Sequence, residues 1–254
     1  MSAAFETRGL TCAFGGLTVA DGITLSLEAG ERAALIGPNG AGKTSFVNLA
    51  AGALAPQSGA IFLNGEDVTG LGPAARVKRG LVRTFQVSRL FAEMSVAEHV
   101  ALAALQRRGE AGRMFGDYRA MPAVMQEVDA TLARLGLEAL AQRKVGVIAY
   151  GQQRLVEIAI ALALRPKVLL LDEPAAGVPH GETQRIEAAL AGLPPDLAVL
   201  MIDHDMDLVF RFARRIVAMA SGAIIFDGAP DEAARDPRVR AAYLGSYGHA
   251  GRRD

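Results

Sequence analysis

The residues with the clearest chemistry form a glycine-rich run between an apolar segment, 33–36, and a segment with helical spacing, 45–51. The run and the residue after it read Gly37-Pro38-Asn39-Gly40-Ala41-Gly42-Lys43-Thr44-Ser45. Between a strand and a helix, such glycines let backbone N–H groups surround phosphate oxygens at the positive end of the helix dipole. Lys43 can reach the β- and γ-phosphates, and the Thr44 hydroxyl can ligate Mg²⁺. We therefore predict a nucleoside triphosphate site rather than an ordinary glycine-rich turn.

Two acidic residues, Asp172 and Glu173, follow the apolar run 168–171, which predicts a central parallel strand. Asp172 is placed to hold Mg²⁺ directly or through water. Glu173 comes one residue later, is expected to point away from Asp172, and could polarise an attacking water. Either residue alone could simply cap a strand end, but the pair in a phosphate-loop protein favours a catalytic role.

Two more polar residues close predicted strands. His204 follows the strand that ends at residue 202, and Gln86 follows the segment 81–85. Ligands of open α/β sheets bind at the carboxyl ends of the strands. His204 could donate a hydrogen bond to the γ-phosphate, whereas the Gln86 amide could contact the metal or the water. Taken alone, Gln86 is no more than a polar strand end.

A second glycine lies at a predicted helix start, in the segment Ile148-Ala149-Tyr150-Gly151-Gln152-Gln153-Arg154 ahead of the helix 155–164. A helix N-terminus with a glycine at the point of closest approach favours an anion. One nucleotide does not need two such helix ends from a single chain. The simplest interpretation is that Tyr150, Gly151 and Gln152 serve a nucleotide held by a partner chain.

These motifs, in this order and over nearly the whole chain, resemble the ATP-binding cassette (ABC) superfamily of transporter ATPases. The resemblance implies that ATP and Mg²⁺ are the cofactors, that Lys43, Gln86, Glu173 and His204 act in catalysis, and that Thr44, Gln86 and Asp172 hold the metal. It also makes Phe14 the aromatic residue that stacks on adenine. An ordinary core phenylalanine is the alternative interpretation of Phe14.

A finer resemblance is to the ATPase subunits of branched-chain amino-acid importers. It is carried by the segments 84–86, 89–91, 94–100 and 173–177 and by the ending Ala242-Tyr243-Leu244-Gly245. That family implies a second ABC ATPase subunit, identical or different, two membrane permease subunits and an extracytoplasmic solute-binding protein. The chain is then expected at the cytoplasmic face of the membrane as a peripheral protein.

Two positions depart from the superfamily pattern. Ala149 stands where the signature commonly has serine, and Pro179-His180 stands where the loop after Glu173 usually has Asp or Asn. Because that loop normally crosses to the partner subunit, the second departure concerns communication between two ATP sites more than hydrolysis itself.

Composition narrows the function classes. The 254 residues carry 27 Lys+Arg and 27 Asp+Glu, so no overall basic field favours nucleic acid, and we expect no nucleic-acid partner. The single cysteine, Cys12, excludes an internal disulfide. No apolar stretch approaches the roughly 18 residues that a spanning helix needs. A soluble chain is therefore expected.

The expected fold is a single α/β domain, residues 1–254, with a P-loop NTPase (RecA-like) core, an antiparallel β-subdomain and an inserted helical subdomain. The core and β-subdomain are predicted at about 1–86 and 166–254, and the helical subdomain at about 87–165. The predicted strands are 5–13, 19–27, 33–36, 59–65, 81–85, 168–171, 197–202, 216–220 and 223–226. The predicted helices are 45–51, 73–79, 96–107, 122–135, 155–164, 181–191, 206–212, 231–235 and 237–244.

Two alternative functions keep the same ATP site. One is the ATPase of a lipid or lipopolysaccharide export system, which differs in its membrane subunits. The other is a soluble ABC ATPase that acts on DNA or the ribosome, which usually brings a long coiled coil or a second cassette with a basic linker. We expect neither feature here, and the transported solute is not determined by this chain.

Overall fold

The computed structural model describes residues 3–84, 90–111 and 118–247, and these form two compact units. The first unit comprises Met1–Leu81, Lys167–Leu171 and Asp196–Asp254, and the second comprises Val82–Pro166 and Asp172–Pro195. The predicted helical subdomain, about 87–165, falls inside the second unit, whereas the predicted core segment 166–254 is shared by both. The predicted subdomain boundaries therefore remain a prediction.

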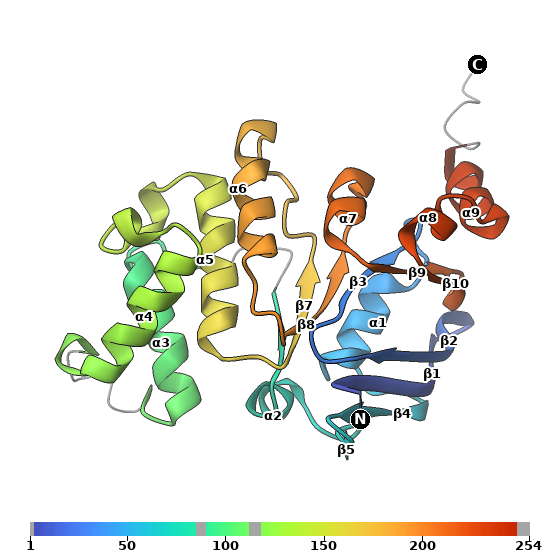
Figure 1. The fold of residues 1–254 in the computed structure, drawn as a ribbon. Coiled ribbons are helices and arrows are strands. Elements are labelled where there is room, and N and C mark those ends of the chain that lie inside the picture. The colour runs from blue at the N-terminus through green and yellow to red at the C-terminus, as the bar shows by residue number, and fades with distance from the viewer. Residues whose placement is uncertain (1–2, 85–89, 112–117, 248–254) are drawn as a thin grey trace. The chain divides into compact units, whose positions relative to one another are not determined.

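The first unit contains an antiparallel sheet of order β2-β1-β4-β5 (Figure 1). Its strands are β1 Phe5–Phe14, β2 Leu17–Leu27, β4 Ser58–Leu63 and β5 Glu66–Asp67. Strands β1 and β2 pair from Phe5 opposite Leu27 to Phe14 opposite Leu17, so Gly15 and Gly16 form a two-residue hairpin loop. Burial alternates along β1 on each side of an irregularity between Thr7 and Leu10, and it places Phe5 before that irregularity and Leu10 after it in the core. The predicted antiparallel subdomain is thus confirmed.

A second sheet has the order β10-β9-β3-β8-β7-β6. Its strands are β3 Arg32–Ile36, β6 Leu81–Arg83, β7 Val168–Asp172, β8 Ala198–Ile202, β9 Arg215–Ala220 and β10 Ala223–Gly228. Strand β3 runs parallel to β8 and β9, and β10 pairs antiparallel with β9. Strands β7 and β8 are buried along their whole length, as the apolar runs predict for central parallel strands. The predicted α/β P-loop fold is confirmed, but β6 ends at Arg83 and so does not reach Gln86.

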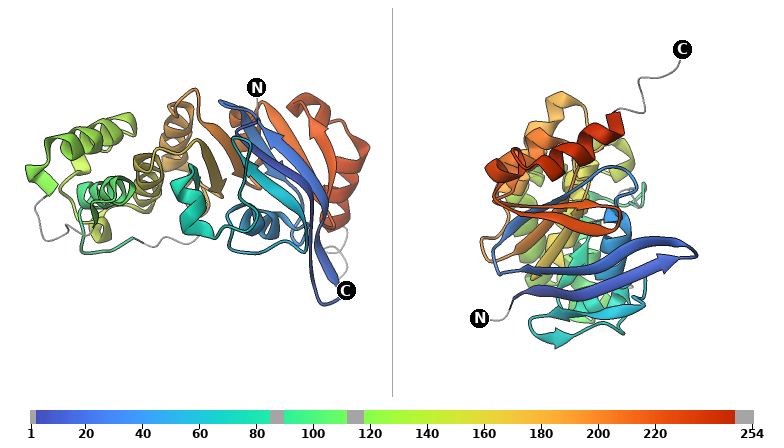
Figure 2. Two further views of the ribbon diagram at one scale, coloured as in Figure 1. Left: turned by 90° about the horizontal axis from the view of Figure 1, so that it is seen from below. Right: turned by 90° about the vertical axis from the view of Figure 1, so that its right-hand side faces the viewer.

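The helices of the first unit are α1 Lys43–Ala50, α2 Pro73–Lys78, α7 Met206–Phe212, α8 Pro230–Ala233 and α9 Pro237–Tyr247. Helix α1 buries Phe46, Val47 and Leu49 in a core that also includes Phe5 and Leu200. Helices α8 and α9 pack against β10, and α8 also contacts β9 (Figure 2). The C-terminal segment is therefore part of the unit that carries the phosphate loop.

The second unit is mainly helical (Figure 1). Its helices are α3 Val96–Arg108, α4 Pro122–Arg134, α5 Tyr150–Ala163 and α6 His180–Ala191, with short 3₁₀ helices at Tyr118–Ala120, Glu138–Leu140 and Val145–Val147. Helices α3, α4 and α5 pack on one another, and α6 packs on α5. A capping box starts α3: the Ser95 hydroxyl accepts from the Glu98 N–H at 3.2 Å, and Glu98 accepts from the Ser95 N–H at 2.6 Å.

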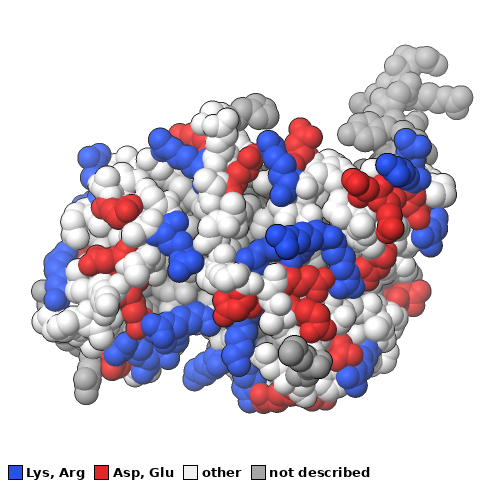
Figure 3. Space-filling model, in the orientation of Figure 1, with Lys and Arg blue, Asp and Glu red and all other residues white. Residues whose placement is uncertain are grey.

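Two properties concern the surface. Figure 3 shows side chains of both charge signs interspersed over the face that it draws, in keeping with a formal net charge of zero. Among the helices of the described ranges, none combines the length and apolar composition that crossing a membrane requires.

Candidate nucleotide-binding site

The phosphate loop leaves β3 at Ile36 and enters α1 at Lys43, and its shape depends on close backbone contacts. Gly42 precedes α1 with φ 101°, a conformation that residues with side chains rarely adopt. A Cβ atom at Gly42 would lie 2.3 Å from the Val19 carbonyl oxygen, and one at Gly37 would lie 2.3 Å from the Met219 carbonyl oxygen. Glycine is therefore required at both positions by the packing of the loop itself.

Lys43 curls back over the loop. Its Nζ donates to the Gly37 carbonyl at 2.5 Å and to the Pro38 carbonyl at 2.9 Å. The side chain is half-buried, whereas Thr44 at the next position is exposed. The structure thus holds the ammonium at the loop, where it can exchange carbonyl oxygens for phosphate oxygens, and leaves the Thr44 hydroxyl accessible.

Helix α1 is anchored by a buried arginine that the sequence did not single out. Arg76 is 1% exposed and donates to the Leu49 and Ala50 carbonyls, both at 2.7 Å. Further bonds reach the Leu71 carbonyl at 2.8 Å and the Thr69 carbonyl at 2.9 Å. Burial lowers the pKa of Arg76, but a guanidinium keeps its charge in proteins. The cation therefore donates to the last two carbonyls at the negative end of the helix that carries Lys43.

His204 follows β8 in the same unit, and its position is set by Asp203. Asp203 is 3% exposed, and its Oδ1 accepts the N–H groups of His204 at 2.7 Å and Asp205 at 3.0 Å. The His204 side chain is 71% exposed, with Nδ1 3.8 Å from Asp203 Oδ1. Because β8 pairs in parallel with β3, His204 and the phosphate loop leave the sheet at the same edge.

Asp172 ends β7 in the second unit and is held by residues of β6 and its end. Arg83 Nη2 lies 2.7 Å from Asp172 Oδ2, with side chains 12% and 7% exposed. The Asp172 N–H donates to the Thr84 hydroxyl at 3.2 Å. The residue types predicted Asp172 but not Arg83, whose only sequence signal is its place in the predicted strand before Gln86. Gln86 itself lies outside the described residues.

Glu173 has an uncommon backbone conformation, with φ 47°. The left-handed region is sparsely populated by residues other than glycine and, when found, clusters at functional sites. The Ala176 N–H donates to the Glu173 carbonyl at 3.1 Å, so the chain turns directly after the strand. Because of this turn, Glu173 does not continue the regular strand conformation of β7. The residue types did not predict the turn.

The signature segment begins helix α5, at Tyr150 rather than at Leu155. Ala149 is the residue before the first turn, and its N–H donates to Gln152 Oε1 at 3.0 Å. The Tyr150 side chain is 39% exposed, while Gly151 is buried. The Gly151 N–H donates to Glu182 Oε2 at 3.1 Å, a contact that the sequence did not predict.

Phe14 lies in the first unit, and its exposure bears on its predicted contact with adenine. Its side chain is 52% exposed at the end of β1, so it is not a core residue. An exposed aromatic ring can stack on a planar base, and that contact stays a prediction.

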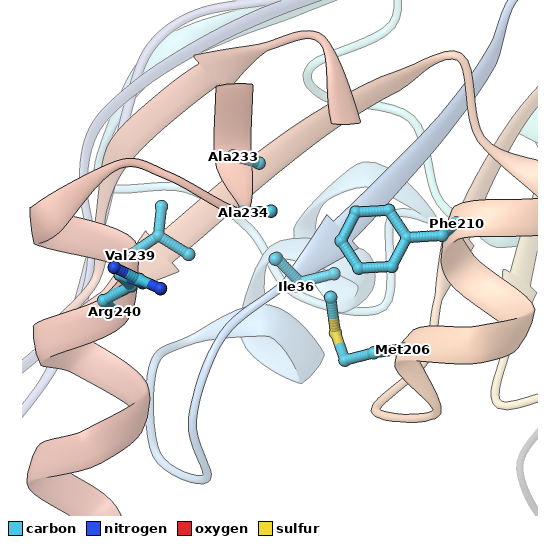
Figure 4. Close-up of a pocket in the computed structure, with 7 residues that line it drawn as sticks. All are labelled: Ile36, Met206, Phe210, Ala233, Ala234, Val239 and Arg240. Carbon is cyan, nitrogen blue, oxygen red and sulfur yellow. The ribbon is translucent and has the colours of Figure 1, made fainter. Parts of the chain in front are cut away.

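A separate apolar pocket of about 200 Å³ lies in the first unit between α7, α8 and α9 (Figure 4). Ile36, the residue before the phosphate loop, forms part of its wall. The pocket is lined by Ile36, Met206, Phe210, Ala233, Ala234, Val239 and Arg240. Phosphate groups require several donors, and only Arg240 in this lining carries a charge. The pocket is therefore not the nucleotide site.

A glycine-dependent loop joins a strand to a helix and holds its lysine on the loop, and a carboxylate lies at the end of a parallel strand. These features define a P-loop nucleotide-binding ATPase. Residues 20–176 match the ABC transporter family, and residues 223–249 match the family described as branched-chain amino acid ATP-binding cassette transporter.

Relatives of known role are similar over nearly the whole chain. The high-affinity branched-chain amino acid transport ATP-binding protein BraF of Pseudomonas aeruginosa PAO1 is 40% identical over 248 residues, covering 94% of this chain and 97% of its own length. The LivG protein of Escherichia coli K12, which carries the same description, is 37% identical over 248 residues, with the same coverage. The structure of the ADP conformation of MJ1267, an ATP-binding cassette of an ABC transporter, has a TM-score of 0.82 and 30% identity, covering 96% of this chain and all of that one.

The chain therefore belongs to the ABC transporter ATPases, in the family of ATP-binding proteins of branched-chain amino acid transport. The family predicted from the motifs is confirmed.

Proposed function

We propose that the chain is the ATP-hydrolysing subunit of an importer for branched-chain or related amino acids. The observation that carries the proposal is that the family specific to this transport matches residues 223–249, outside the nucleotide-binding motifs that all cassettes share. The described part of this segment, residues 223–247, contains β10, α8 and α9, and both helices pack against β10. The relatives named for branched-chain amino acid transport support the same solute class.

The phosphate-binding role is assigned to the loop from Gly37 to Ser45, with Lys43 as the cation nearest the β- and γ-phosphates. Mg²⁺ takes oxygen ligands and is commonly bound by one or two carboxylates together with substrate phosphates. The Thr44 hydroxyl and the Asp172 carboxylate are donors of that kind, with Gln86 as a third, so the residues fit the ion. Bound there, Mg²⁺ would neutralise charge on the phosphates. Within the described residues no three or more His, Cys, Asp and Glu side chains gather into a metal site, which fits an ion that arrives with the nucleotide.

The hydrolytic step is assigned to residues after β7 and β8. Glu173 accepts a proton from the attacking water as general base, and His204 donates a hydrogen bond to the γ-phosphate. Phe14 stacks on the adenine ring. Tyr150, Gly151 and Gln152 face the nucleotide of a second ATPase subunit, so two cassettes enclose two ATP molecules and separate after hydrolysis.

A groove of the second unit is the surface that we assign to a membrane subunit. Its volume is about 580 Å³, and it is lined by Phe91, Glu93, Met94, Glu98, Ala101, Leu102, Leu105 and Tyr118. Phe91 is 61% exposed there. A largely apolar groove with an exposed aromatic ring suits a short helix with apolar side chains. The chain would thus work at the cytoplasmic face of a membrane, with a solute-binding protein on the other side.

Reconstitution tests the proposal. The chain is co-expressed with the permease subunits of a branched-chain amino acid importer from the same organism, extracted in mild detergent, and placed in liposomes with the solute-binding protein. We expect co-purification and ATP-dependent uptake of leucine, isoleucine or valine. Phe91→Glu should release the ATPase from the complex while leaving ATP binding intact, and Gln86→Ala should depress uptake in the intact complex. ATP-driven movement of lipid instead of amino acid, or purification without membrane subunits, would contradict the proposal.

A further inference from the structure

The first turn of α5 lacks a capping side chain of its own. Helices usually begin after a Ser, Thr, Asp or Asn whose side-chain oxygen accepts a hydrogen bond from the second or third N–H of the helix. Ala149 holds that position and has no oxygen to offer. Gln152 bonds back to the Ala149 N–H, which satisfies a donor before the helix but no N–H of the first turn. The Gly151 N–H therefore needs an acceptor from elsewhere.

Glu182 supplies this acceptor from the first turn of α6. Its Oε2 lies 3.1 Å from the Gly151 nitrogen, and its own N–H donates to the Pro179 carbonyl at 2.8 Å. A Cβ atom at Gly151 would lie 2.3 Å from Glu182 Oε2 and 3.2 Å from Glu182 Cβ. The half-buried carboxylate thus lies directly against the bare backbone of the glycine. We name this contact the Glu182 cap.

The Glu182 cap joins the first turn of α5 to the segment that follows Glu173. Tyr150 also lies against Gly177, because a Cβ atom on Gly177 would be 3.3 Å from Tyr150 Cε1. Gly177 and Glu182 both follow Glu173 within nine residues of chain. The start of α5 is therefore packed against the stretch of chain that leads away from the proposed general base.

An anion already occupies the helix end to which the proposed function assigns the partner's γ-phosphate. A carboxylate at a helix N-terminus is favoured by the dipole and by a charge-assisted hydrogen bond. The same two effects favour a phosphate. The Gly151 N–H cannot donate a strong hydrogen bond to the Glu182 carboxylate and to a phosphate at the same time. A carboxylate left beside an arriving triphosphate would also repel it.

We propose that Glu182 is a positioning residue that caps α5 in the separated cassette and must leave Gly151 before the partner's ATP can bind there. The proposal rests on the proposed pairing of two cassettes. Glu182 sets the ATP concentration at which the pair closes, because closure must replace its carboxylate with phosphate. The departure of Glu182 would move α6 and the loop before it, which are continuous with Glu173.

The test measures dimerisation of the full chain against MgATP concentration, in a Glu173→Gln background that blocks hydrolysis. Glu182→Gln keeps an oxygen for the Gly151 N–H but removes the charge. We expect the half-closing ATP concentration to fall about tenfold, within the usual range of coupling between two sites. Glu187→Gln removes a charge farther along α6 and should leave that concentration unchanged. The difference between Glu182→Gln and its parent should narrow at high salt, because salt screens charge repulsion.

Thermal unfolding without ATP separates this role from a purely structural one. Glu182→Gln weakens the cap, so the unfolding temperature should fall or stay constant while closure becomes easier. A structural role alone would make closure harder as well. Ala149→Ser is a second test. A serine hydroxyl carries no charge and can accept the Gly151 N–H in place of the Glu182 carboxylate, so this variant should also lower the half-closing ATP concentration. Unchanged or raised concentrations in both variants would overturn the proposal.

The outcome also distinguishes this inference from the proposed function. If the Glu173→Gln parent dimerises with ATP and the Glu182 and Ala149 variants match it, only the role of Glu182 is wrong. If the parent itself never dimerises at saturating ATP, the pairing of cassettes is wrong, and the role of Glu182 is wrong with it.

Discussion

Arg83 Nη2 lies 2.7 Å from Asp172 Oδ2, and both side chains are almost fully buried. The two residues end β6 and β7, which are neighbours in the sheet. The carboxylate that we assign to Mg²⁺ is therefore half of a buried ion pair. Removing one partner of such a pair leaves an uncompensated buried charge, which costs more than the intact pair contributes. Arg83 thus positions the Asp172 carboxylate in the cassette.

Replacing Arg83 should destabilise the protein, and ligand should restore part of the loss. Arg83→Met is expected to lower the free energy of unfolding by about 3–5 kcal/mol, because Asp172 is left buried and unpaired. MgATP should recover some of this loss, since a cation then reaches Asp172. Urea unfolding with and without MgATP measures both quantities. Arg79→Met breaks an exposed pair with Glu66 and should cost under about 1 kcal/mol. An equal loss in the two arginine variants would contradict the assignment.

Replacing the proposed general base should separate binding from hydrolysis. Glu173→Gln is expected to keep ATP affinity while slowing hydrolysis by a factor on the order of 10²–10⁴, the usual contribution of a general base. The variant should also accumulate an ATP-bound dimer. Phosphate release and nucleotide binding are measured side by side, with Glu187→Gln as the control. Turnover equal to that of the parent would assign the proton transfer to another residue.

A side chain at Gly151 should prevent closure of the pair. Gly151→Asp places a carboxylate at the helix end, and in the separated chain it also clashes with Glu182. The double variant Gly151→Asp, Glu182→Ala removes that internal clash and should still fail to close, because the new carboxylate repels the phosphate. Dimerisation against ATP concentration, with hydrolysis blocked, is the measurement. Closure of the double variant at the parent's ATP concentration would show that α5 does not face a phosphate.

Ala149→Ser tests the altered signature by adding one hydroxyl at the start of α5. A hydrogen bond to a charged group contributes roughly 1.5–3 kcal/mol, so the half-closing ATP concentration should fall. The same dimerisation assay decides it, and an unchanged concentration would place the hydroxyl away from any phosphate.

Arg76 should be worth more to stability than its place in a short helix suggests. Arg76→Met removes a donor from the Leu49 and Ala50 carbonyls, of which Leu49 keeps the Gly52 N–H, and we expect a loss of about 3 kcal/mol, in the range for several bonds to a charged group. Because α1 carries Lys43, ATP affinity should fall as well. Denaturant unfolding and nucleotide titration test the two effects, again with Arg79→Met for comparison. If Arg76→Met lowered the free energy of unfolding no more than Arg79→Met, the buried hydrogen bonds of Arg76 would make no special contribution to stability.

The pH dependence of the C-terminal segment should reflect Asp236. Hydrogen bonding from the Arg238 guanidinium lowers the pKa of Asp236 from its ordinary 3.8 to about 2. A depressed pKa means that this interaction contributes stability above the ordinary value and loses it as the pH falls toward 2. NMR titration of the Asp236 carboxyl carbon should give a midpoint near the lower value, and Arg238→Ala should raise it. Equal midpoints in the two proteins would contradict this account.

The sequence alone determined the features that depend on neighbouring residues. The order of glycines, Lys43 and Thr44 between a strand and a helix predicts a phosphate loop, because local backbone freedom and side-chain type suffice to form it. Apolar runs likewise predicted β7 and β8, and alternation predicted the β1–β2 hairpin. Boundaries that depend on where hydrogen bonding stops were less well determined, and β6 ends at Arg83 instead of continuing to residue 85.

Tertiary structure alone decided which polar groups satisfy one another. Arg83 and Asp172 are 89 residues apart, Arg76 and Leu49 are 27 apart, and Gly151 and Glu182 are 31 apart. No periodicity connects such pairs, because each forms only after packed elements have buried a charge or an N–H that then requires a partner. The left-handed backbone at Glu173 belongs with them, since a strained conformation persists only where the surrounding structure imposes it. The residue types therefore indicated the chemistry, and packing decided which partners hold it in place.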